Sequence, residues 1–209
     1  MKFKQAMNLI KSILNINQKT LKSIKIMKNI SKTLTQYGAL ALLVILSWSM
    51  QSCTEPADKF FATAILNTNT ISDFATPTLA KHIEAEAKEF PDIPSSKKNG
   101  DEAGKMIQNN ILYMEKSLSD IKALSANSDD RKAIKEKSIT LYEFVIPVYK
   151  NEYTNYAKLC DSKADETQKE ALAQSIEQKY GSTFEKMYID LMETGKTFAT
   201  ENKLNVDWN

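Results

Sequence analysis

The amino-acid sequence predicts an all-α fold, a four-segment antiparallel helical bundle over residues 56–203 that follows an N-terminal leader. Apolar residues recur at steps of three and four along most of the chain, which is the spacing of one face of an α-helix. The 209 residues include only five glycines and five prolines, so few positions interrupt a helix. No stretch alternates apolar and polar residues as a half-buried strand does.

The first segment is predicted to break before its end. Its apolar stripe consists of Phe60, Ala64, Asn67, Ile71 and Phe74. Pro77 follows, and a proline removes a helical hydrogen bond and clashes with the preceding turn. We therefore expect a break or kink near Ala75, a second helical piece from Leu79 to Phe90, and then a long loop from Pro91 to Gly100, which is rich in turn residues.

The second and fourth segments have regular stripes typical of a bundle. The second stripe is Ile107, Ile111, Met114, Leu118 and Ile121, and the fourth is Leu172, Ile176, Tyr180, Phe184, Met187, Leu191, Gly195 and Phe198. The fourth stripe continues across Gly181, which costs a helix about 1 kcal/mol relative to alanine. We expect packing on both sides of this glycine to outweigh that cost.

The third segment contains a proline within its stripe. The stripe is Ile134, Ser138, Leu141, Val145, Tyr149, Glu152 and Tyr156. Pro147 is expected to bend this helix without ending it, because the apolar spacing resumes afterwards. Ser128 and Asp165 precede the third and fourth segments, where short polar side chains commonly cap helices.

The first 52 residues differ in character from the rest. They contain eight lysines and no acidic residue, and Gly38 to Met50 is the only strongly apolar run. Its thirteen residues are fewer than the ~20 that span a bilayer. They fit the apolar region of a secretory signal peptide, with the small residue Ser52 at the cleavage position before Cys53. An uncleaved signal anchor that carries a sensor-type helical ectodomain is an alternative.

The residues Met50-Gln51-Ser52-Cys53 resemble the lipobox of bacterial lipoproteins, in the relaxed form found in Bacteroidota. The resemblance implies cleavage between Ser52 and Cys53, a fatty-acyl anchor such as palmitate on Cys53, and a place in the cell envelope at the outer membrane. The periplasmic and surface sides both stay open. The following helical part also resembles uncharacterised helical surface lipoproteins of Bacteroidota and leptospires, and that resemblance implies no catalytic residue.

The chain divides into three parts on this interpretation. Residues 27–52 form the signal peptide, with Met27 as an alternative start, so residues 1–26 are an over-extended start or a basic leader. Residues 53–209 form the mature domain, which has 20 basic and 26 acidic residues and hence a net charge of −6. This acidic balance disfavours nucleic acid as a partner. The 157 residues are enough for one domain with a single core.

Two groups of residues are candidates for a site. His82, Glu86 and Glu89 share a predicted helix face and offer nitrogen and oxygen atoms to a metal. A lone histidine among charged residues is more often simply solvated, so we predict no metal site. Four tyrosines, Tyr142, Tyr149, Tyr153 and Tyr156, form a stripe on the third segment. They are interpreted either as a ligand groove lined by phenols or as core residues with outward hydroxyl groups.

The sequence favours binding over catalysis. Cys160 is the only thiol after Cys53, it has no histidine near it in sequence, and its spacing predicts a buried core residue. We identify no catalytic residue and no cofactor. The leading hypothesis is a lipid-anchored, non-enzymatic protein that binds an unknown protein or small molecule, and a periplasmic enzyme or metal-binding domain is the alternative. Pro56 suits a first helical position, so the tether from Cys53 would be about three residues, or ~10 Å.

Overall fold

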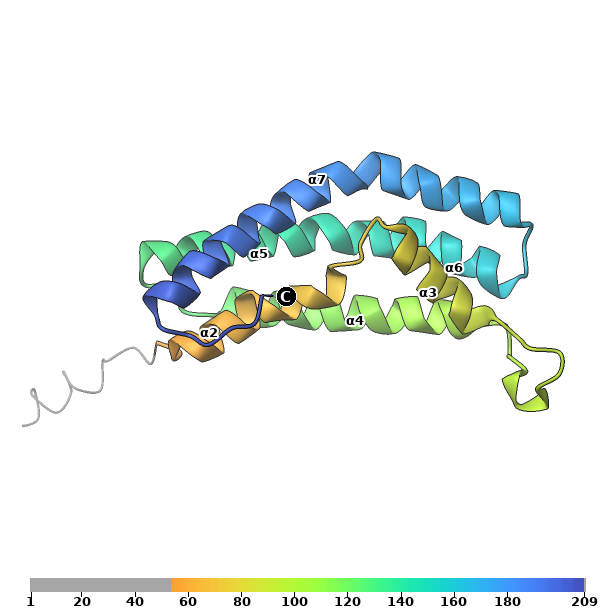
Figure 1. The fold of residues 1–209 in the computed structure, drawn as a ribbon, viewed down its shortest axis with the longest axis horizontal. Helices are drawn as coiled ribbons and strands as arrows, with labels where there is room; N and C mark the ends of the chain where they lie inside the picture. The colour runs from red at the N-terminus through yellow and green to blue at the C-terminus, as the bar shows by residue number, and fades with distance from the viewer. Residues whose placement is uncertain (1–53, 209) are drawn as a thin grey trace, which may run out of the picture. The chain divides into compact units, whose positions relative to one another are not determined.

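Helix is the only regular secondary structure in residues 54–208, the part of the chain that this computed structural model describes. The predicted all-α bundle is therefore confirmed. Ser52 and Cys53 lie outside the described residues. Figure 1 shows four segments that run alternately in opposite directions: α2 to α3, α4, α5 to α6, and α7. None of the helices in residues 54–208 is both long enough and apolar enough to span a membrane.

The first segment is broken at Ala75, as the sequence predicts. It consists of α2 (Ala57–Ala64), a short 3-10 helix (Leu66–Ile71) and α3 (Pro77–Ala87). Ala75 adopts a φ of 54°, a left-handed conformation that ends the first run before Pro77 starts the next. Thr76 caps α3 by accepting a hydrogen bond from the N–H of Leu79.

Helix α4 (Glu102–Ala123) buries a narrower stripe than its sequence suggests. Ile107, Met114 and Ile121 are fully buried, whereas Ile111 and Leu118 are only partly buried. Ser117 is buried in their place, so the buried face of α4 is rotated slightly toward this serine.

Helix α5 (Asp129–Val148) continues beyond Pro147 through one π-helical turn (Tyr149–Tyr153) into α6 (Thr154–Asp161). The predicted continuation past this proline is thus correct. A π turn spaces its hydrogen bonds five residues apart and therefore holds one residue more than the matching α turn. The hydroxyl of Thr154 donates a hydrogen bond to the carbonyl oxygen of Tyr149, which stabilises the wide turn.

Helix α7 (Glu166–Glu201) has 36 residues and runs along the whole bundle, about 54 Å at 1.5 Å per residue. The side chain of Asp165 caps it by accepting a hydrogen bond from the N–H of Thr167. Ser128 stands at the N-cap of α5 as predicted, although its side chain makes no capping bond. After α7 the chain turns back, and Trp208 packs its ring edge-on against Phe61 of α2.

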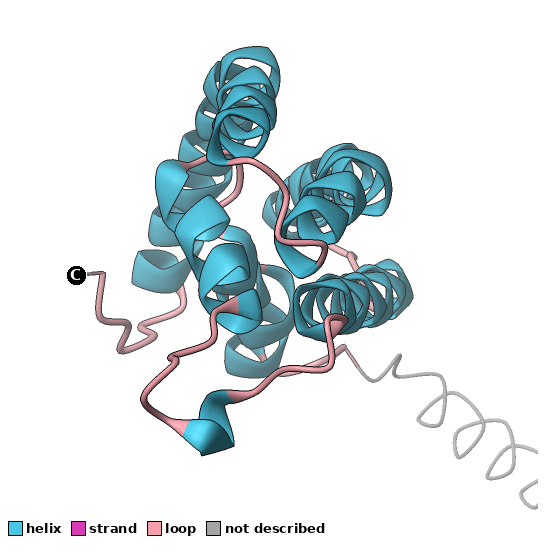
Figure 2. Ribbon diagram, turned by 90° about the vertical axis from the view of Figure 1, so that its right-hand side faces the viewer, coloured by secondary structure: helices cyan, strands magenta, loops and turns pink. Residues whose placement is uncertain are grey.

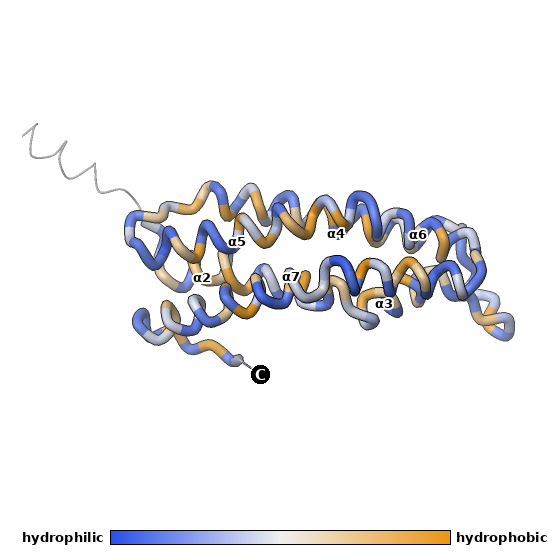
Figure 3. The backbone as a smooth tube through the Cα atoms, turned by 90° about the horizontal axis from the view of Figure 1, so that it is seen from above, coloured by the Kyte–Doolittle hydropathy of each residue, from blue (hydrophilic) through white to orange (hydrophobic). Residues whose placement is uncertain are grey.

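Helix α5 lies beside both α4 and α7 and packs against each. The end-on view of Figure 2 shows the helices gathered around a common interior. Figure 3 shows hydrophobic and hydrophilic residues alternating along each helix, the expected pattern for amphipathic helices. Phe74, from the break in the first segment, is central to the core: its ring packs against the rings of Phe144, Tyr149, Tyr153, Tyr180 and Phe184.

Candidate interaction site: the N-terminal clamp and the tip loop

The first described residues are hydrogen-bonded to the turn between α4 and α5. The side-chain amide of Asn127 donates to the hydroxyl of Thr54 at 2.7 Å, and the N–H of Ser125 donates to the carboxylate of Glu55 at 3.1 Å. Arg131 donates from Nη1 to the carbonyl oxygen of Glu55 at 2.9 Å. We call this set of contacts the N-terminal clamp. It holds the chain from the residue directly after Cys53.

Arg131 is the strongest member of the clamp. Its guanidinium lies 4.7 Å from the ring centre of Phe60 and 5.8 Å from that of Phe198, so cation–π attraction adds to the hydrogen bond. The pKa of the Glu55 carboxyl is lowered, first by its own backbone N–H and further by the N–H of Ser125 and the charge of Arg131. The clamp therefore favours an ionised Glu55.

The four tyrosines of the predicted groove lie in the core, each with at most 2% of its surface exposed. The hydroxyl of Tyr142 donates to the carbonyl oxygen of Asn67 at 2.9 Å, and that of Tyr156 donates to the carboxylate of Glu84. Burial raises the pKa of Tyr142 to about 12. The hydroxyl groups of Tyr142, Tyr153 and Tyr156 thus bond to the first segment and do not point outward. None of the four tyrosines lines the clefts described below.

Cys160 and His82 do not have the properties of a thiol activated by a neighbouring histidine. Cys160 is buried, and burial raises the pKa of its thiol to about 12, so the thiolate is strongly disfavoured. His82 is exposed, with Nδ1 at 3.7 Å from the carboxylate of Asp73. Within residues 54–208 no group of three or more histidine, cysteine or acidic side chains is arranged to hold a metal ion.

Two open clefts flank α3. The first has a volume of about 690 Å³ and lies between α3 and the α6–α7 turn, with Cys160 among its lining residues and lysines and glutamates around it. The second, of about 740 Å³, lies between the Ala75 break and the middle of α7. Its lining includes Glu177 and Glu185 and contains no basic residue. Both clefts have mixed apolar and polar walls.

The loop between α3 and α4, residues 88–101, projects from the end of the bundle opposite Thr54 (Figure 1). We call it the tip loop. At its centre is a short 3-10 turn, Pro94–Ser96. The hydroxyl oxygen of Ser96 accepts from the N–H of Phe90 at 2.8 Å and lies 2.7 Å from the carbonyl oxygen of Ile93, to which the hydroxyl donates. Ser96 therefore closes the tip of the loop on itself.

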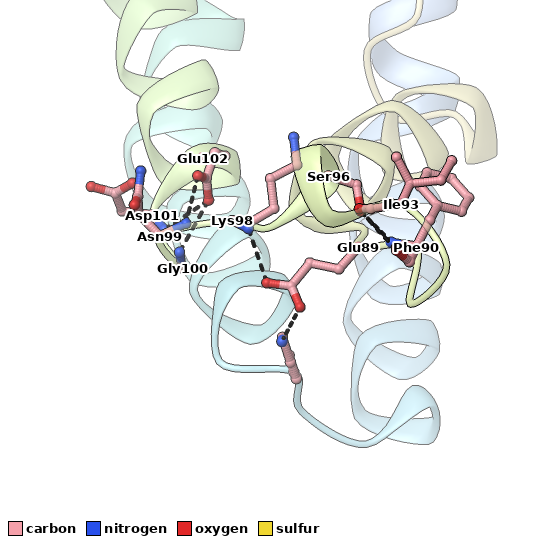
Figure 4. Close-up of polar contacts among 10 residues, drawn as sticks. Glu89, Phe90, Ile93, Ser96, Lys98, Asn99, Gly100, Asp101 and Glu102 are labelled. Carbon is pink, nitrogen blue, oxygen red and sulfur yellow. Dashed lines mark hydrogen bonds and ion pairs between the residues drawn. The ribbon is translucent and has the colours of Figure 1, made fainter.

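Two carboxylates fix the base of the tip loop (Figure 4). Glu89 accepts from the N–H of Lys98 at 3.0 Å with one oxygen and from the ammonium of Lys163 at 3.0 Å with the other. Glu102 accepts from three successive N–H groups, those of Asn99, Gly100 and Asp101. These bonds, led by that from Asn99, lower the pKa of Glu102 to about 2.

Two large apolar residues of the tip loop, Phe90 and Ile93, are exposed to solvent over 49% and 50% of their surface. The sequence predicts a helix to Phe90 and a loop from Pro91, but α3 ends at Ala87, so Phe90 belongs to the tip loop. The helical spacing of the sequence does not single out the side chains of Phe90 and Ile93. The available signal was two large apolar residues set between prolines and lysines in an otherwise polar stretch.

Comparison of the chain with protein-family models, with curated proteins and with solved structures gives no match.

Proposed function

We propose that this chain is a lipid-anchored protein of the cell envelope that acts at the outer membrane by binding, not by catalysis. The observation that carries the proposal is the N-terminal clamp, which fixes Thr54 and Glu55 to the α4–α5 turn. The lipobox-like residues end at Cys53, so no free linker would lie between a lipid on that cysteine and the folded bundle.

The clamp shortens the tether expected from the sequence. Because Thr54 is already bonded to Asn127, only the bond from Cys53 to Thr54 separates an acyl anchor from the bundle, about 3.5 Å of chain. An anchor at this position would hold the α4–α5 turn against the bilayer. It would also restrict how the bundle can tilt, which a long flexible linker would not do.

Two features of the bundle favour binding over catalysis. The thiol of Cys160 is a core group with a raised pKa, so it is unsuited to act as a nucleophile. The tip loop, in contrast, exposes Phe90 and Ile93 on a backbone that is internally bonded. Apolar side chains that are exposed together are typical of surfaces that bind a protein or a membrane.

Metabolic labelling with a fatty acid tests the anchor. Mature protein that begins at a diacylglyceryl-modified Cys53 is expected, and Cys53→Ala should abolish the label. Mass spectrometry of protein extracted from membranes identifies the first residue. Native protein that retains residues 27–52, or a Cys53→Ala variant that still takes up label, would contradict the proposal and favour the signal-anchored alternative.

The binding role is tested on intact cells. Protease shaving reports whether the bundle faces the surface or the periplasm, and crosslinking followed by identification reports what it touches. Turnover of a substrate by the purified protein that is lost in His82→Ala or Cys160→Ser would contradict the binding proposal and support an enzyme.

A further inference from the structure

We propose that the tip loop inserts Phe90 and Ile93 into the interface of an anionic lipid bilayer. The two side chains are about half exposed and line neither of the two clefts, and the loop that carries them projects from the bundle in Figure 1. A convex apolar tip cannot enclose a small ligand. A bilayer interface can deform around it and take both side chains out of water.

The backbone of the tip loop is suited to a place of low water content. Unsatisfied N–H groups are costly at membrane depth, and Pro91 and Pro94 have none. The N–H of Phe90 is bonded to Ser96, and the N–H of Ile93 is bonded to the carbonyl oxygen of Phe90 at 2.9 Å. At the base, Glu89 and Glu102 accept the N–H groups of residues 98–101.

The charges around the tip loop fit anionic headgroups. Lys88, Lys97 and Lys98 flank the two apolar residues, and the ion pairs within residues 54–208 involve other lysines. The ammonium of Lys88 lies 5.2 Å from the ring centre of Phe90, so its carbon stem follows the apolar surface. Glu89 is neutralised by Lys163 at 3.0 Å. Asp92 is the acidic residue at the exposed end of the loop, and it is itself exposed.

The position of the tip loop allows it to reach the bilayer that an anchor on Cys53 would occupy. In Figure 1 the loop projects below α4, and the start of α2 lies toward the same side at the other end of the bundle. One flat surface could therefore meet both. Insertion of the tip loop does not require a lipid anchor on Cys53. Only the idea that the anchor and the tip loop enter the same bilayer rests on the proposed function.

Site-specific fluorescence tests the insertion. The full-length chain, processed by its host and purified from membranes, is labelled at Ser95→Cys with an environment-sensitive nitrobenzoxadiazole group, since Ser95 is exposed beside the tip. Cys160 is buried with a raised pKa and should not react. A control label at Thr183→Cys lies on α7, where Thr183 is exposed and lines neither cleft. The protein is placed in vesicles of phosphatidylcholine and phosphatidylglycerol that carry brominated acyl chains.

The expected result is a blue shift and quenching of the Ser95 label, with neither at Thr183. The double variant Phe90→Ser/Ile93→Ser should lose both signals. Ile189→Ser is the matched control, because Ile189 on α7 is 49% exposed and Ile93 is 50% exposed. Circular dichroism checks that all variants keep their helix content. Vesicles of phosphatidylcholine alone should give weaker quenching, since the lysines then lack anionic partners.

Three outcomes would overturn the inference. One is an unquenched Ser95 label in protein that sediments with the vesicles, a result that leaves the lipid anchor intact. Another is equal quenching in the Phe90→Ser/Ile93→Ser variant. The third is an unquenched Ser95 label together with a protein that crosslinks to the tip loop in cells. That pair of results would make the tip loop a protein-binding site. If Cys53 carries no lipid, flotation of the labelled protein with the vesicles tests whether the tip loop binds the bilayer without an anchor.

Discussion

The backbone N–H of Ala75 donates a hydrogen bond to the hydroxyl oxygen of Tyr153 at 2.9 Å, across 78 residues of chain. Ala75 has a left-handed φ of 54° and is buried, so the N–H has no access to water. The bond joins the break in the first segment to the π turn of the third. A strained backbone position and an unusual helical turn are thus held together by one phenol.

Tyr153→Phe should destabilise the bundle by about 1–3 kcal/mol, because it leaves the buried N–H of Ala75 without an acceptor. Chemical denaturation followed by circular dichroism measures the change. Tyr113→Phe is the control, since Tyr113 is 45% exposed and its hydroxyl can bond to water. An unchanged midpoint for Tyr153→Phe would show that the N–H of Ala75 finds another partner.

Two glycines in α7 should respond to alanine in opposite directions. A Cβ at Gly181 would lie 3.6 Å from the carbonyl oxygen of Ala75, an ordinary contact, so Gly181→Ala should stabilise the bundle by up to about 1 kcal/mol through helix propensity. A Cβ at Gly195 would lie 3.1 Å from Cδ1 of the fully buried Ile65. Overpacking there should make Gly195→Ala destabilising by about 1 kcal/mol or more.

Thermal denaturation of the two variants, side by side, checks this pair. Both substitutions gain the same helix propensity, so the difference between them isolates the contact with Ile65. Equal stabilisation by both would show that the Ile65 side chain moves aside at little cost. If Gly195→Ala is destabilising as expected, Ile65→Val in that background removes the close Cδ1 atom and should recover part of the lost stability.

Acid should weaken the base of the tip loop through Glu102. Its pKa falls from 4.5 to about 2 on folding, so the stabilisation by the carboxylate is complete above pH 4.5 and is lost as the pH falls toward 2. NMR titration of the carboxyl group measures the pKa directly. Glu102→Gln should remove this part of the acid dependence of the denaturation midpoint, whereas Glu170→Gln, on an exposed face of α7, should not. A carboxyl that titrates near 4.5 would contradict the three-bond arrangement.

Helical spacing alone predicted most of the fold. Ile134, Leu141 and Val145 are fully buried, and the break at Ala75 follows from the constraint that Pro77 places on the chain before it. These features depend on residues close together in sequence. They are the features that local propensity and periodicity can determine.

The candidate site was harder to predict, because its contacts join distant parts of the chain. The clamp pairs Glu55 with Arg131, and the tip loop depends on Lys163, which is 74 residues from Glu89. A proline such as Pro147 indicates a bend but not the π turn that follows it. Likewise, the tyrosine stripe has the same spacing whether it lines a groove or fills a core, and only the fold distinguishes the two.

The π turn at Tyr149–Tyr153 also has an evolutionary meaning. Such a turn has the geometry of a one-residue insertion into an α-helix, so its removal would be a single-codon deletion that leaves α5 and α6 facing as they do now. The deletion would cost one of two tyrosine contacts. An ordinary α turn cannot keep both Tyr149 stacked on Phe74 and Tyr153 bonded to Ala75. Relatives of this chain that lack the extra residue should therefore also lack the left-handed alanine, and the two features should be gained or lost together.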